Sequence, residues 1–120
     1  MYEVLISENF KWNEFIGNLY FSRYFDNNPA LFLKTEENIP IIICTVDIPE
    51  FFNEYPFGDN KLVIVKNNNE NQGILESLTD AGVAENVFTI SDTSQMEALE
   101  ICELSESVID LLKSCGEYYV

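Results

Sequence analysis

The stretch "IPIIICTVDIP" at residues 39–49 restricts the possible folds of this chain more than any other segment. It is almost continuously apolar, it is rich in β-branched side chains, and Pro40 and Pro49 bound it. Such a run is typical of a strand that is covered on both faces of a sheet. We therefore expect a central strand here, with the rest of the fold built around it.

Further strands are predicted by short β-branched and aromatic runs that turn-forming residues separate. Two turn signals, "DNNP" and "ENIP", flank a predicted hairpin partner. The segment at 95–105 fits two patterns: as a strand it puts Glu97, Leu99, Ile101 and Glu103 on one face, and as a helix it aligns Glu97, Glu100, Glu103 and Glu106. We favour the strand. The other predicted strands are "MYEVLIS" (1–7), "FIGNLYFSRYF" (15–25), "ALFLKTE" (30–36), "KLVIVK" (61–66) and "ENVFTIS" (85–91).

Two helices are predicted, at 72–82 and 105–115. The first has Asn69 or Asn71 as its expected cap and Gly82 just after its end. The second begins at Ser105 and ends near Gly116. The segment "EFFNEYPFGDN" (50–60) is expected to be an irregular loop or a short helical turn. Together these elements predict a single α+β domain over residues 1–120, in which both helices pack on one face of an antiparallel sheet of five or six strands.

Charge is the unusual property of the composition. The chain has 21 Asp and Glu residues against 6 Lys and Arg, which gives a formal net charge of −15 and a pI near 4.1. Most of the excess lies in residues 35–60 and 85–120, which hold only one basic residue, Lys113. A chain this acidic repels nucleic acid and anionic membranes, so we expect neither as a direct partner. Its expected partner is a basic protein surface.

Several classes of function are disfavoured by what the sequence lacks. There is no histidine to act as a general base or metal ligand, so we expect no enzyme activity, no metal and no cofactor. Cys44, Cys102 and Cys115 are far apart in sequence and are interpreted as reduced core thiols. The start "MYEVLISENF" lacks the basic region of a signal peptide, and a cytoplasmic location is expected.

The segment "ENQGILESLTDAGVAEN" carries a resemblance to a protein family. It fits the pattern Asn-(Glu/Gln)-Gly-(Ile/Met)-Leu-Glu-x-Leu-x-x-Ala-Gly-(Ile/Val), which here spans Asn71 to Val83. In this the chain resembles small uncharacterised accessory proteins carried by conjugative elements and phages of gut bacteria, with a looser match from about Phe21 to Leu104. The resemblance implies a mobile-element setting and transfers no activity and no functional residue. The block "SESVIDLLKSCGEYYV" departs from the pattern and looks like an added helix.

The acidic blocks supply the candidate binding surface. Carboxylates lie roughly 6.6 Å apart at i,i+2 on a strand and about 6 Å apart at i,i+4 on a helix, so they can stand in for phosphates in a nucleic-acid-binding groove. The alternative is that the acids only keep the protein soluble. The candidate acids are Glu36, Glu37, Asp47, Glu50, Glu54, Asp59, Glu97, Glu100, Glu103, Glu106 and Asp110.

Aromatic residues are interleaved with the acids at 50–59. Tyr55 and Phe57 are candidate anchors for a partner within an acidic rim. The alternative is a segment that folds over the core, and we favour that alternative.

The leading hypothesis is an anti-CRISPR protein, an acidic DNA mimic that blocks nucleic-acid binding by a Cas9-type nuclease. An anti-restriction protein would use the same surface on another enzyme. Two further alternatives are an immunity protein for a basic nuclease toxin and an acidic accessory domain without a nuclease target. Monomer and dimer are both left open.

Overall fold

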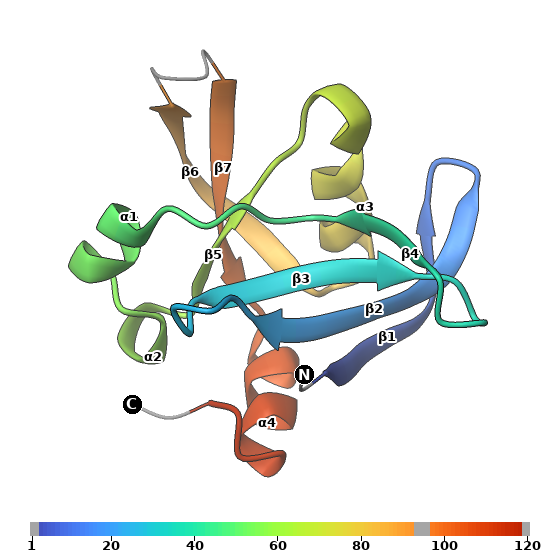
Figure 1. Ribbon diagram of the computed structural model, residues 1–120, viewed down its shortest axis with the longest axis horizontal. Coiled ribbons are helices and arrows are strands. Elements are labelled where there is room, and N and C mark those ends of the chain that lie inside the picture. Colours follow the sequence, from blue (N-terminus) through green and yellow to red (C-terminus); the bar gives the residue numbers. More distant parts are fainter. Residues whose placement is uncertain (1–2, 93–96, 119–120) are drawn as a thin grey trace.

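Two antiparallel sheets form the framework of this protein (Figure 1). The computed structural model describes residues 3–92 and 97–118, without the side chains of Asp92 and Glu97. Within that part, the four-stranded sheet has the order β1-β2-β3-β4, built from β1 (Val4–Trp12), β2 (Phe15–Arg23), β3 (Pro29–Lys34) and β4 (Pro40–Ile43). The three-stranded sheet has the order β5-β7-β6, built from β5 (Leu62–Val65), β6 (Ala84–Asp92) and β7 (Glu97–Leu104). The α+β class is confirmed, whereas the single sheet of five or six strands is replaced by two sheets.

The division between the sheets falls inside the apolar run at 39–49. Its first part is β4, an edge strand whose neighbouring residue Ile39 and own residue Ile43 are 58% and 59% exposed. At Cys44 the chain leaves this sheet: the Cys44 N–H donates to Leu31 O, while the Cys44 carbonyl accepts from Lys66 N–H next to β5. The prediction of one central, doubly covered strand is therefore wrong. The run is apolar throughout because its two halves serve two different sheets.

The two predicted helices lie close to their expected positions, as α3 (Ile74–Asp80) and α4 (Glu106–Ser114), with a 3-10 turn, η1 (Asn69–Asn71), before α3. The segment at 50–60, for which a loop or a short helical turn was expected, holds the two short helices α1 (Pro49–Glu54) and α2 (Phe57–Asn60). Both α3 and α4 end with a glycine in the left-handed region, Gly82 at φ 71° and Gly116 at φ 73°. In each case the N–H of the glycine and the N–H of the residue after it donate to carbonyls of the last turn, as in a Schellman motif.

The start of α3 differs from the prediction. Neither Asn69 nor Asn71 caps the helix, because η1 holds both of them before the helix begins. Instead, Asn67 Oδ1 accepts the Leu75 N–H at 2.8 Å and so satisfies one of the free donors of the first turn. Asn71 is only 2% exposed and donates to the Ile43 carbonyl at 2.7 Å, which ties η1 to β4.

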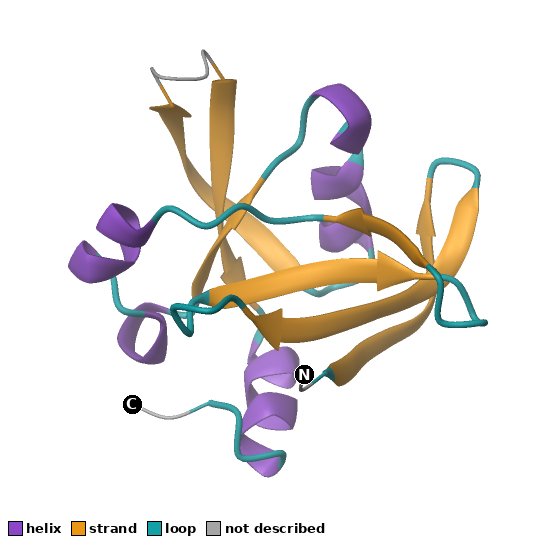
Figure 2. Ribbon diagram, viewed as in Figure 1, coloured by secondary structure: helices purple, strands orange, loops and turns teal. Residues whose placement is uncertain are grey.

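The main core lies between the inner faces of the two sheets, with α3 and α4 closing its sides (Figure 2). A smaller core lies on the other face of the three-stranded sheet, where Phe51 and Phe52 of α1 cover Leu99 and Ile101 of β7. Thus β7, rather than the run at 39–49, is a strand covered on both faces, and its prediction as a strand is confirmed. The outer face of the four-stranded sheet has no such covering helix among the described residues.

Candidate protein-binding surface

The predicted acids are distributed around the molecule, and those with described side chains form no ion pair with a lysine or arginine in the described part of the chain. The ion pairs found there join Lys34 to Glu3, Arg23 to Glu117 and Lys66 to Glu70. Glu97 belongs to β7, but its side chain lies outside the described residues. Glu36 and Glu37 are exposed in the β3–β4 turn, away from the other candidates in sequence.

The acids of β7 are arranged as the favoured strand requires, and not as the helical alternative would align them. Because β7 is a strand, Glu100 shares a face with Cys102, whereas Glu103 shares the opposite face with Ile101. Glu100 is half-buried, and its carboxylate accepts from Asn86 Nδ2 and Thr89 Oγ1, both at 2.7 Å. Glu103 is exposed and lies opposite Glu85 on β6, so two like charges face each other across the strands.

Two helices each present a pair of exposed acids at i,i+4 spacing. Glu50 and Glu54 lie on α1, and Glu106 and Asp110 lie on α4. A rise of 1.5 Å per residue separates the members of each pair by about 6 Å along the helix. Like charges at this spacing are mildly destabilising, so neither pair is explained by helix stability.

A third acidic group connects the β2–β3 turn to the approach to α1. The carboxyl groups of Asp26 and Asp47 are hydrogen-bonded to each other, and Asn28 Nδ2 donates to Asp47 Oδ1 at 2.8 Å. Burial, the Asp26 hydrogen bond and the charges of Asp26 and Glu50 raise the pKa of Asp47 to about 6. We call Asp26, Asp47 and Glu50 the α1 acidic cluster. Asp26 was missed in the sequence because it lies in "DNNP", which indicates only a turn.

The two aromatic candidates occupy different environments. Phe57 is 7% exposed, stacks on Phe21 at 5.7 Å and meets Tyr118 edge-on at 5.5 Å, so it is part of the main core. Tyr55 is half-buried and stacks on Phe51 at 4.9 Å. This placement agrees with a segment folded over the core. Asp59 is exposed on α2, and its charge adds to the burial that raises the pKa of Tyr118.

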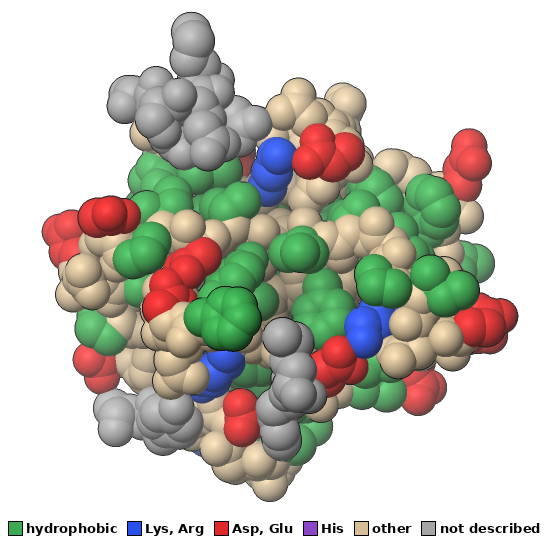
Figure 3. Space-filling model, in the orientation of Figure 1, with side chains coloured by type: hydrophobic (Ala, Val, Ile, Leu, Met, Phe, Trp, Pro, Cys, Tyr) green, Lys and Arg blue, Asp and Glu red, His purple; other side chains and the backbone are tan. Residues whose placement is uncertain are grey.

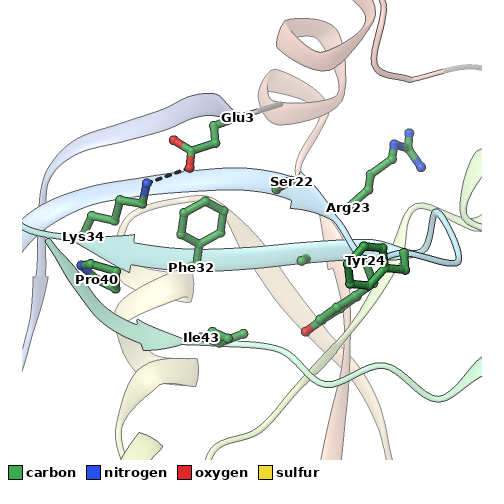
Figure 4. Close-up of a pocket in the computed structure, with 10 residues that line it drawn as sticks. Glu3, Ser22, Arg23, Tyr24, Phe32, Lys34, Pro40 and Ile43 are labelled. Carbon is green, nitrogen blue, oxygen red and sulfur yellow. Dashed lines mark hydrogen bonds and ion pairs between the residues drawn. The ribbon is translucent and has the colours of Figure 1, made fainter. Parts of the chain in front are cut away.

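The outer face of the four-stranded sheet carries an apolar surface that sequence analysis did not single out. Register aligns one residue from every strand in a row, namely Leu5, Tyr20, Phe32 and Ile43. Beside this row is a hollow of about 450 Å³ whose lining includes Ser22, Ala30, Tyr24, Phe25, Phe32 and Ile43 (Figure 4). In the space-filling view of Figure 3, apolar side chains gather over the centre of the molecule, between scattered acids. The only signal in the sequence was that β2 carries aromatics at both odd and even positions.

Comparisons with protein-family models, with curated proteins and with solved structures give no match. No helix in residues 3–92 and 97–118 combines the length and the apolar character that crossing a membrane requires. Over the same residues, no group of three or more Cys, Asp and Glu side chains is arranged to hold a metal ion.

Proposed function

We propose that this protein is an acidic inhibitor that occupies the nucleic-acid-binding surface of a defence nuclease, with a Cas9-type effector as the first target to test. The observation that carries the proposal is the pairing of exposed acids on α1 and α4, Glu50 with Glu54 and Glu106 with Asp110, without a cationic partner among the described residues. Exposed carboxylates about 6 Å apart offer a basic groove a spacing similar to that of backbone phosphates.

The chemistry of the target explains why such an inhibitor would work. An RNA-guided nuclease holds its nucleic acid in positively charged channels and reads the PAM duplex with arginines. A compact polyanion that enters such a channel excludes DNA by occupying the same cations. Long-range attraction between opposite charges also accelerates association, and added salt weakens it.

The α1 acidic cluster supports binding to a cationic partner. Burial raises the pKa of Asp47, and the hydrogen bond with Asp26 and the charges of Asp26 and Glu50 add to that effect, so the charged state of Asp47 is disfavoured in the free protein. An arginine or lysine of a partner placed against this cluster relieves that repulsion. Binding should therefore lower the pKa of Asp47.

The decisive experiment is competition. A purified Cas9–guide complex is incubated with PAM-containing duplex DNA and increasing amounts of this protein, at two salt concentrations, with a neutral small domain as the control. Displacement of DNA that weakens as salt rises is the expected result. Absence of binding at either salt concentration rejects Cas9 as the target and directs the same assay to restriction enzymes and basic nuclease toxins.

Charge-reversed variants identify the surface. Glu50→Lys with Glu54→Lys tests α1, and Glu106→Lys with Asp110→Lys tests α4. The matched control is Glu8→Lys with Glu76→Lys, which changes the net charge equally at two exposed acids outside the proposed surface. At least one test pair should weaken competition about tenfold or more, whereas the control pair should have a much smaller effect. Equal losses for all three pairs would mean that only net charge matters.

A further inference from the structure

The turn between β2 and β3 places a protruding aromatic side chain beside an open hollow. Phe25 is fully exposed, with a relative exposure of 107%, while no other large apolar side chain in the described part of the chain exceeds 59%. Exposing an entire Phe side chain to water costs roughly 2 kcal/mol or more relative to burying it. A single exposed Phe is common enough, but here it adjoins an unfilled apolar site.

The shape of the hollow follows from the residues that alternate along β2 and β3. Tyr20 pairs with Phe32, and the next outward-facing pair is Ser22 with Ala30. Small side chains next to large ones leave a depression, and the outward-facing pair Ser22 and Ala30 forms its floor. The larger side chains of Phe32, Ile43 and Tyr24 also line it (Figure 4). Tyr24 is fixed in place because its hydroxyl donates to the Thr45 carbonyl at 3.1 Å.

We propose that this face is the interface of a two-fold dimer, in which Phe25 of each copy fills the hollow of the other. A projection and a depression that lie side by side on one chain are self-complementary, as a two-fold interface requires. Each copy then provides an aromatic anchor and the pocket that receives it, which is the arrangement of a binding hot spot. This inference is independent of the proposed inhibitory function.

The distribution of charge allows two copies to meet at this face. Both cations that line the hollow have acidic partners within their own chain, Lys34 with Glu3 at 2.6 Å and Arg23 with Glu117 at 3.6 Å. The charges that line the hollow are therefore balanced, whereas Asp26 directly follows Phe25 and the chain as a whole carries −15. The repulsion between two copies comes from Asp26 and from the acids elsewhere on the chain, and salt screens it.

The area of this face fits a weak dimer rather than a tight one. Its four strands have nine, nine, six and four residues, which present a face of roughly 440 Å² in flat projection. The relief of the side chains and the 24–28 turn add to this area. A standard interface buries about 800 Å² from each partner, so the dimer belongs with the small interfaces of weak, transient complexes.

Sedimentation equilibrium at two salt concentrations tests the dimer. The expected species has a mass of 27.6 kDa, twice the 13.8 kDa of one chain, and its fraction should increase with salt. This dependence is opposite to that expected for inhibition of a nuclease, so either proposal can fail without the other. If the wild-type chain stays monomeric at several hundred micromolar protein at both salt concentrations, the proposed dimer is rejected. The hollow would then be a site for a side chain of another protein.

Three variants locate the contact. Phe25→Ala should raise the dimer dissociation constant about 100-fold, tenfold for each of the two symmetry-related side chains. Ala30→Leu fills the hollow from its floor and should also block dimerisation, with the circular dichroism spectrum unchanged. Val87→Ala is the matched control, because Val87 is 54% exposed on β6 in the other sheet. A Phe25→Ala protein that dimerises as well as the Val87→Ala control contradicts the proposed interface.

Discussion

The carboxyl groups of Asp26 and Asp47 are hydrogen-bonded to each other, and this contact joins the β2–β3 turn to the segment that leads into α1. The pKa values of the two groups move apart. Burial and the neighbouring acids raise the pKa of Asp47 to about 6, whereas the hydrogen bond from Asp47 lowers the pKa of Asp26. Asp47 therefore holds the proton of this pair at a higher pH than Asp26 does.

Replacing Asp47 by asparagine should stabilise the protein in a pH-dependent way. The folded pKa of Asp47 lies above its unfolded value of 3.8, so its protonated form favours the folded state at low pH and that contribution is lost as pH rises through about 6. Asp47→Asn can keep both hydrogen bonds without the charge. We expect it to raise the free energy of unfolding by about 0.5–1 kcal/mol at pH 8, after solvent screening, and by roughly half as much at pH 5, which lies between the unfolded and folded pKa values.

Urea denaturation of both proteins at pH 5 and pH 8 measures this difference. The lower pH stays above the range in which Asp26, with its lowered pKa, takes up a proton. A stabilisation of equal size at both pH values would show that the charge of Asp47 is not its cause.

Truncation of Phe57 should lower stability far more than truncation of Tyr55. Phe57 is buried between Phe21 and Tyr118, so Phe57→Ala should reduce the free energy of unfolding by about 3–4 kcal/mol. Tyr55 is half-buried and stacks only at the edge of the smaller core, and its loss should cost about 1 kcal/mol. Thermal unfolding followed by circular dichroism compares the two. A small loss of stability for Phe57→Ala would mean that Phe57 is not part of the core.

The three thiols should differ in reactivity. Burial raises the pKa of both Cys44 and Cys102 to about 12, whereas Cys115 is exposed after the end of α4. The prediction of three core thiols is therefore wrong for Cys115. A thiol reagent such as DTNB should modify one group quickly in the native protein and all three in denaturant, and Cys115→Ser should abolish the fast reaction. Rapid modification of a second thiol in the native state would contradict the burial of Cys44 or Cys102.

Two glycines should respond differently to alanine. A Cβ at Gly17 would lie 2.2 Å from the Lys34 carbonyl oxygen of β3, so Gly17→Ala must disturb the β2–β3 pairing and should cost more than about 2 kcal/mol. Gly82→Ala meets no atom within 4 Å and suffers only from its φ of +71°, for which about 1 kcal/mol is expected. Urea denaturation of both variants tests the order. If Gly82→Ala lowers the free energy of unfolding more than Gly17→Ala does, the close approach of β2 to β3 is not what makes Gly17 necessary.

Elements were more predictable from the sequence than their arrangement. Capped amphipathic segments and turn residues have local causes, which is why the end of α3 at Gly82 and the start of α4 after Ser105 match the structure. The cap of α3 was not predictable, because Asn67 and the intervening 3-10 turn have no distinct local signature. The predicted acids with described side chains are mostly exposed. The alignment of Glu97, Glu100, Glu103 and Glu106 belonged to the helical alternative, which the strand β7 excludes.

The sequence by itself determined the acidity of this protein, its α+β class and the approximate position of most helices and strands. These properties depend on composition and on periodicity over a few residues. The tertiary structure alone decided that residues 39–49 divide between two sheets, that Asp26 meets Asp47, and that the hollow opens beside Phe25. Each of these depends on the pairing of strands that are distant in sequence. A run of apolar residues has the same local pattern whether it stays in one sheet or crosses to another.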